Sequence, residues 1–306
     1  MNISNNSKPI APLYIGYLST IAAAIIWGIN GTMVQYLVRY KEINIEWLVT
    51  VRLMIPGVLL LGALVFRNSY EQIFAVWKNR KDALALIVFS LALATVQYTF
   101  FAAIKASNAA VATILQFSAP AMVAAYYALI HLKMPSYIEV IAVLFALVGT
   151  FLLATKGQVR SMEISGAALF WGLTSAVALA FYSIQPIRLL SKYRSTIVVA
   201  WGMLIGSVFF SFVHAPWRVG GVWDGYTISY FTFIILLGSL VAFSLYLRAV
   251  KLSGAYITTL LTSIEPLTAT IISVLWLQVA FGLAEIVGGI CIISTIFILT
   301  LRRSTY

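Results

Sequence analysis

The chain has 306 residues, of which 62% are hydrophobic and 9% are charged, with a formal net charge of +11 and a mean hydropathy of +0.98. This composition leaves too little polar surface for a soluble domain, so it predicts an integral membrane protein. The apolar runs are about 20 residues long and do not alternate, which favours helices over a β-barrel. The basic residues lie in short loops between these runs, so we interpret them as topology signals rather than as a nucleic-acid surface.

Ten apolar runs are long enough to cross a bilayer. They cover residues 13–37, 44–66, 83–104, 108–130, 136–155, 164–187, 195–214, 228–249, 253–277 and 281–301. The first run is full-length and lacks a small-residue cleavage site, so we expect a retained span rather than a cleaved signal peptide. No connection is long enough for a soluble domain, and the longest, 67–82, is basic and expected at the membrane interface.

The distribution of Lys and Arg predicts the orientation of the chain. With the amino terminus inside, the cytoplasmic segments hold more than twice as many basic residues as the outer loops. We therefore expect a multi-pass protein of the cell membrane with both termini in the cytoplasm. The single cysteine, Cys291, lies in an apolar run and excludes an internal disulfide.

The stretch 247–276 combines a carboxylate, Glu265, with a proline, Pro266, inside an apolar run. We interpret it as one membrane-spanning helix that bends at the proline, which removes a backbone donor. A charge at bilayer depth costs roughly 2.5 to 3.5 kcal/mol on insertion scales, so such a side chain faces protein or a wet cavity. The pair indicates either a structural kink with a satisfied carboxyl or a role in lining and coupling.

An internal repeat relates residues 101–120 to 247–266, which align without gaps and share Lys105/Lys251, Ser107/Ser253 and Pro120/Pro266 among other identities. The repeat divides the chain into halves 1–157 and 158–306, with five predicted spans each. An odd number of spans places the two copies in opposite orientations. Inverted repeats around a site at mid-depth are typical of secondary transporters.

At this point the chain resembles the drug/metabolite transporter superfamily, and within it the EamA family. The resemblance rests on Trp27-Gly28 in the first run, Arg52 in the second, and the stretches 107–120 and 253–266. It implies an all-α membrane bundle of ten helices, built as two inverted five-helix repeats around a central cavity. It further implies that spans one, three, four, six, eight and nine line this cavity, which opens alternately to either side, and that small metabolites, amino acids among them, are exported.

Polar and aromatic residues on these spans are the candidates for substrate binding, because amides and phenols buried in hydrocarbon must find partners and therefore face the bundle. The candidates are Trp27, Asn30, Gln97, Tyr98, Phe101, Gln116, Tyr182, Gln185, Tyr246, Thr262 and Glu265. The structural alternative for each is hydrogen bonding between helices, at about 0.6 kcal/mol per bond. Such a lining suits a small zwitterion or an aromatic, partly apolar solute.

Arg52 has two interpretations. In the structural one, it pairs with Glu46 near the outer interface or extends toward that interface. In the functional one, it binds a substrate carboxylate through bidentate hydrogen bonds.

The sequence therefore predicts a secondary transporter of a small organic metabolite, in which Glu265 alternates between protonated and charged forms because apolar surroundings disfavour the charge. A multidrug efflux permease is the alternative within transport, and a non-transporting scaffold or sensor is the alternative outside it. We do not expect an enzyme, since HExxH is missing and Asp82 and Asp224 lie in expected loops. The chain has no GxxxxGK[ST] loop for ATP, and we expect no metal, cofactor or nucleic-acid partner, only solute, lipid and protons.

Overall fold

The computed structural model describes residues 10–67, 70–107, 109–131, 136–157, 165–277 and 282–301. Every regular element in these ranges is a helix. The first half contains α1 (Ile10–Tyr40), α2 (Ile45–Arg67), α3 (Tyr70–Phe74), η1 (Ala75–Lys78), α4 (Arg80–Ala106), α5 (Ala109–Gln116), α6 (Ala119–His131) and α7 (Tyr137–Thr155). The second half contains α8 (Gly166–Ile184), α9 (Ile187–Lys192), α10 (Ser195–Ser211), α11 (Gly225–Phe233), η3 (Ile234–Val241), α12 (Ala242–Ser253), α13 (Ala255–Leu261), α14 (Ile264–Leu277) and α15 (Leu283–Leu301).

The predicted all-α membrane architecture is confirmed at the level of its helices. Among the described residues, eight helical segments are long and apolar enough to cross a membrane. Two further apolar helices, Ser195–Ser211 and Leu283–Thr295, are shorter. The count of ten spans therefore stays a prediction.

The interpretation of 247–276 as one continuous helix is wrong. The chain turns at Gly254, which has a φ of +86° and joins α12 to α13. A second interruption at Thr262 and Ser263 then separates α13 from α14. In the first half, α5 and α6 are interrupted at Phe117 and Ser118, in the aligned part of the repeat.

The most extensive helix contacts join the two halves to each other. In these pairs α2 packs on α10, α7 packs on α15, α4 packs on α8, and α1 packs on α12. The pairing is reciprocal, because the third long helix of each half packs on the first helix of the other. The two halves therefore form one bundle, with the space between them at its centre.

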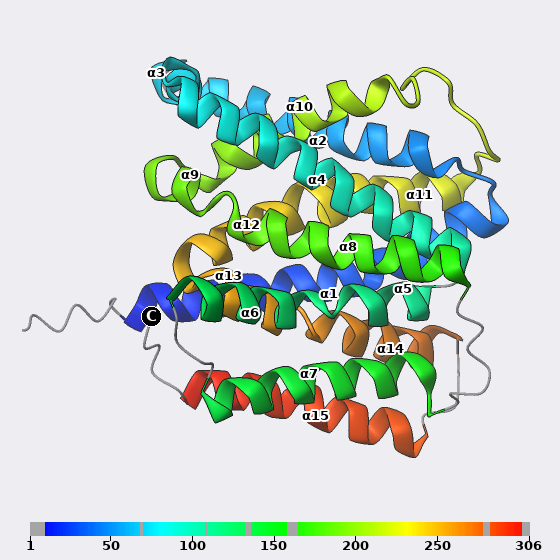
Figure 1. The fold of residues 1–306 in the computed structure, drawn as a ribbon. Helices are drawn as coiled ribbons and strands as arrows, with labels where there is room; N and C mark the ends of the chain where they lie inside the picture. The colour runs from blue at the N-terminus through cyan, green and yellow to red at the C-terminus, as the bar shows by residue number, and fades with distance from the viewer. Residues whose placement is uncertain are drawn as a thin grey trace, which may run out of the picture.

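Figure 1 shows the direction of these helices. The first helices of the halves, α1 and α8, run in opposite directions, and so do α7 and α15. Helix α1 begins and α15 ends at the same end of the bundle, which we call the amino-terminal end.

Ion pairs join the two halves at both ends of the bundle. At the amino-terminal end, Lys192 Nζ lies 2.8 Å from a carboxylate oxygen of the buried Asp82, which also accepts a hydrogen bond from the Tyr193 hydroxyl. Asp82 lies in the first turn of α4, so the expectation of a loop was wrong there. At the opposite end, Lys41 Nζ lies 2.6 Å from Asp224, which caps α11 through the Thr227 backbone N–H. Each pair joins the segment after the first helix of one half to the start of the third span of the other.

The Asp224 pair gives a testable pH dependence. The hydrogen bonds from Lys41 and Thr227 hold the pKa of the Asp224 carboxyl well below its usual range. A carboxyl whose pKa is lowered in the folded state stabilises the fold at pH values above its unfolded-state pKa, which is near 3.9. This contribution is lost as the pH falls through the folded-state pKa. Asp224→Asn should therefore melt below wild type at neutral pH, and the gap should narrow below about pH 4.

Thermal unfolding of the detergent-purified protein across that pH range measures the effect. Glu71→Gln, at an exposed position on α3, is the matched control. If the difference in melting temperature between Asp224→Asn and wild type is the same at all pH values, the ion pair is not its cause.

Candidate functional site

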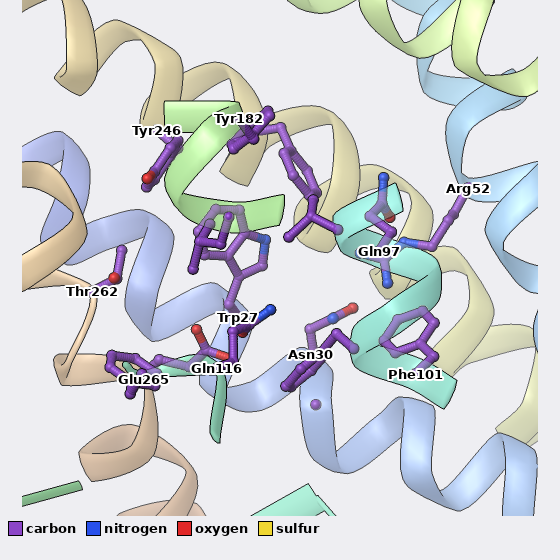
Figure 2. Close-up of a pocket in the computed structure, with 16 residues that line it drawn as sticks. Trp27, Asn30, Arg52, Gln97, Phe101, Gln116, Tyr182, Tyr246, Thr262 and Glu265 are labelled. Atoms are coloured by element: carbon purple, nitrogen blue, oxygen red, sulfur yellow. The ribbon is translucent and has the colours of Figure 1, made fainter. Parts of the chain in front are cut away.

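A cavity lies between the two halves (Figure 2). Its walls come from α1, α2, α4, α8 and α12 and from the interruptions between α5 and α6 and between α13 and α14. The lining residues are Trp27, Asn30, Gly31, Arg52, Val96, Gln97, Phe100, Phe101, Gln116, Phe117, Leu179, Tyr182, Phe243, Tyr246, Thr262 and Glu265. About 80 Å³ is open to the centre of a water molecule. One water needs roughly 10 to 15 Å³ on this measure, so the cavity holds several waters or one small solute.

The structure brings most of the predicted candidates together in this cavity. Those that line it are Trp27, Asn30, Gln97, Phe101, Gln116, Tyr182, Tyr246, Thr262 and Glu265, together with Arg52. Sequence reasoning missed Gly31, Val96, Phe100, Phe117 and Leu179. These small or apolar residues have no signal that separates a cavity wall from a lipid face.

Two candidates lie outside the cavity. Tyr98 packs between the rings of Trp171 and Phe210, at centroid distances of 5.5 and 5.3 Å. Gln185 follows α8, and its Nε2 donates a 2.7 Å hydrogen bond to the Ala85 carbonyl. Gln185 therefore joins two helices by a hydrogen bond, as in the structural alternative, whereas Tyr98 fills a space between helices with its ring.

Aromatic rings form one wall of the cavity. The Trp27 ring lies 4.9 Å from Phe243 and 5.3 Å from Tyr246, and Tyr246 stacks on Tyr182 at 5.6 Å. The Tyr246 hydroxyl shares a 2.6 Å hydrogen bond with Ser183. Because each ring is held by its neighbours, this wall offers rigid faces for an apolar or aromatic group.

Other lining residues carry polar atoms without partners. Asn30 Oδ1, both amide atoms of Gln97 and the Tyr182 hydroxyl are buried and form no hydrogen bond within the described part of the chain. Gln116 differs, since its Nε2 donates to Ser175 Oγ at 2.6 Å. Buried polar groups in proteins are nearly always satisfied, so these atoms are candidates for binding water or a solute.

Glu265 lies directly after the interruption between α13 and α14. Pro266 cannot donate a backbone hydrogen bond to the Thr262 carbonyl, and the Glu265 N–H bonds to this carbonyl at 2.8 Å instead. The Glu265 carboxyl lines the cavity and forms no ion pair among the described residues. The interruption therefore places a carboxyl without an ion-pair partner among the described residues in the cavity that Asn30 and Gln97 also line.

Arg52 also lines the cavity, and among the described residues it forms no ion pair with Glu46, the partner that the structural interpretation gave it. Only 3% of its surface is exposed, and its Nε donates a 3.1 Å hydrogen bond to Ser239 Oγ. Its guanidinium carbon lies 4.9 Å from the centre of the Phe101 ring. Ser239 belongs to η3, a π-helical stretch, and such stretches frequently occur at functional sites.

The apolar helices and the cavity between the halves define a multi-pass membrane protein with a central cavity. Comparison with known proteins identifies the family. The EamA-like transporter family matches residues 14–155 and 166–301, so the chain belongs to this family of membrane transporters. The resemblance seen in the sequence is confirmed, and transporters are not an enzyme class.

One relative is similar along nearly the whole chain. The uncharacterized inner membrane transporter YicL of Salmonella typhimurium is 38% identical over 287 residues, which are 94% of this chain and 95% of YicL. A solved crystal structure superposes with a TM-score of 0.77 at 16% identity and covers 94% of this chain and 96% of its own. At that identity the likeness shows the fold alone.

Gly28 allows α1 to approach the interruption closely. A Cβ atom there would lie 2.6 Å from the Glu265 carbonyl oxygen and 2.8 Å from Thr268 Cβ. Gly28→Ala should destabilise the protein by about 1 to 3 kcal/mol, because the backbone of α14 cannot yield as a flexible side chain would. The measurement is thermal unfolding in detergent.

Gly62→Ala is the control for this variant, since apart from its own stretch of α2 no described atom lies within 4 Å of the added carbon. It should leave the melting temperature unchanged or raise it, because alanine is favoured over glycine in a helix. Equal melting temperatures for Gly28→Ala and wild type would show that α1 and α14 separate without cost.

Proposed function

We propose that the chain is a secondary transporter that exports a small organic metabolite, an amino acid or a related compound, across the cell membrane. The observation that carries this proposal is the cavity between the halves, which combines aromatic walls, unpartnered amides and an unpaired carboxyl. Rings bind the apolar part of a solute, and polar groups at fixed positions orient its polar ends. YicL, an uncharacterized inner membrane transporter, supports a location in the cell membrane. The basic residues predict that both termini lie in the cytoplasm.

Transport by alternating access is the second part of the proposal. The reciprocal packing of the halves and the opposite directions of α1 and α8 support an inverted repeat of five spans each. Ion pairs hold the halves together at both ends of the cavity, Lys192 with Asp82 and Lys41 with Asp224. Opening to one side separates the pair at that end, while the pair at the other end stays closed.

A multidrug efflux permease is the second candidate function. The aromatic wall around Trp27, Tyr182 and Tyr246 favours it, because ring faces accept many apolar solutes and cations. The two candidates differ in selectivity. Proteoliposomes that release amino acids but not lipophilic cations support the metabolite exporter, and the reverse result supports the permease.

The proposed role of Glu265 in coupling gives a prediction about driving force. We expect proteoliposomes with the wild-type chain to move labelled amino acids faster when a pH gradient is applied. Glu265→Gln removes the proton-binding group but keeps its size, so acceleration by the gradient should be lost while exchange of solute for solute persists.

Glu71→Gln, on the exposed side of α3, controls for general loss of a carboxyl. A Glu265→Gln variant whose transport responds to the gradient as wild type does would reject the coupling. If a pH gradient does not change the rate of wild-type transport, the protein is a facilitator and is not coupled to protons.

The two ion pairs give a prediction about alternating access. In a chain with Cys291 replaced by alanine, cysteines at 41 and 224 are joined by a reducible bifunctional thiol reagent. The cross-link should stop transport because that end can no longer open, and reduction should restore it. Cysteines at 82 and 192 should behave in the same way at the other end.

Single-cysteine variants treated with the same reagent are the controls. Transport at an undiminished rate by fully cross-linked protein would show that the end concerned does not open during the cycle.

A further inference from the structure

The guanidinium of Arg52 is a buried cation without an acid beside it. Its residue is 3% exposed, and it forms no ion pair within the described ranges. Glu265, which lines the same cavity, lies on its opposite side in Figure 2. Arginine stays charged in proteins, and a buried charge is costly unless a counter-charge and hydrogen bonds compensate it. The Arg52 guanidinium therefore needs an anion beside it, and the described part of the chain does not provide one.

The structure holds this cation in a fixed direction. Arg52 Nε donates to Ser239 Oγ at 3.1 Å, and Ser239 Oγ in turn donates to the Ile234 carbonyl at 2.9 Å. That second bond spans the π-helical stretch η3, so the irregular backbone itself positions the serine. The Phe101 ring lies against the guanidinium carbon at 4.9 Å. With Nε occupied, the two terminal nitrogens remain as parallel donors, which match the two oxygens of a carboxylate.

Unused polar groups accompany Arg52 in the cavity wall. Both amide atoms of Gln97 and the Oδ1 of Asn30 are buried without hydrogen-bond partners in the described residues, and each residue is 5% exposed. Figure 2 shows Gln97 next to Arg52 and Asn30 on the same side of the cavity. The Gln97 amide has a donor for an anion and an acceptor for a neighbouring ammonium or hydroxyl group.

We propose that Arg52 binds the carboxylate of the transported solute, that Ser239 positions the guanidinium for it, and that the substrate class is therefore small organic acids with a free carboxylate, amino acids included. This inference rests on the proposed transport function and narrows it. The aromatic wall receives the apolar part of the acid, and Glu265 lies on the side where an amino group or a proton is held.

Matched pairs of solutes test the inference on the purified full-length protein. The pairs are L-phenylalanine with 2-phenylethylamine, L-tryptophan with tryptamine and L-lysine with cadaverine, each differing by the carboxylate. A ligand that binds only the folded state stabilises it by RT ln(1 + [L]/Kd), so the rise in melting temperature with ligand concentration yields the dissociation constant of the acid and that of the amine. We expect the acid of at least one pair to bind about 10- to 100-fold more tightly than its amine. This is the gain in affinity that a hydrogen bond to a charged group provides.

Variants test whether Arg52 carries this preference. Arg52→Gln should make the acid and its partner bind equally, and Arg52→Lys should recover only part of the ratio because lysine has no planar fork. Ser239→Ala should reduce the ratio less than Arg52→Gln does. Arg248→Gln, at an exposed position of α12, is the control and should keep the wild-type ratio.

Several outcomes overturn the inference. They are amines that bind wild type as tightly as their acids, a ratio that survives in Arg52→Gln, no acid that binds at all, and binding of inorganic phosphate in place of every carboxylate. If Arg52→Gln does not fold, the inference is tested by comparing the amine-to-acid ratio of dissociation constants in wild type with that in Ser239→Ala. Transport assays in proteoliposomes separate the transport function from the Arg52 site. Transport of amines without any preference for carboxylates supports the transport function and rejects the site. Carboxylate binding without transport supports the site and rejects the transport function.

Discussion

Arg52 and Glu265 are ionisable groups on apolar helices that are expected to cross the membrane, where hydrocarbon provides neither water nor hydrogen-bond partners, and this shortage constrains the whole arrangement. Both side chains turn away from lipid and into the cavity between the halves. The outer faces of α7 and α15 are apolar instead, with exposed residues such as Leu144 and Ile290. The cost that excludes charge from the lipid-facing surface thus concentrates the polar chemistry at the centre of the bundle.

The same shortage explains where the backbone departs from regular helix. A carbonyl that has lost its usual donor needs another one, and the cavity is where such partners exist. The Thr262 carbonyl, freed by Pro266, accepts from the Glu265 N–H, and the Gly238 carbonyl within η3 accepts from Trp27 Nε1 at 3.0 Å. The irregular segments and the polar side chains therefore share one location because they solve the same problem of hydrogen bonding.

Much of this arrangement was predictable from the sequence, and the remainder has a common physical cause. Hydropathy predicted apolar helices, and amides or phenols such as Gln97 and Tyr182 indicated cavity positions, because polar groups avoid lipid. The pattern of polar and apolar residues along one helix does not show which other helix packs against each of its faces. Tyr98 therefore proved to fill a space between helices, and Arg52 lined the cavity without an ion pair to Glu46 among the described residues. Pro266 predicted a bend in one continuous helix, but not that Thr262 and Ser263 leave the helix altogether.

The repeat provides two equivalent scaffolds, but the charged groups occur once each. In the earlier part of each half the two copies are offset by 150 residues, as in Gly16 and Gly166, so position 202 corresponds to Arg52. This position holds glycine, and an added Cβ would meet the Phe89 ring at 2.5 Å. Position 119 corresponds to Glu265 in the first half and holds a buried alanine. A symmetric pair of cations and acids would let a solute bind in two opposed orientations. With one cation from the first half and one acid from the second, the cavity favours a single orientation, while the reciprocal packing of the helices is kept.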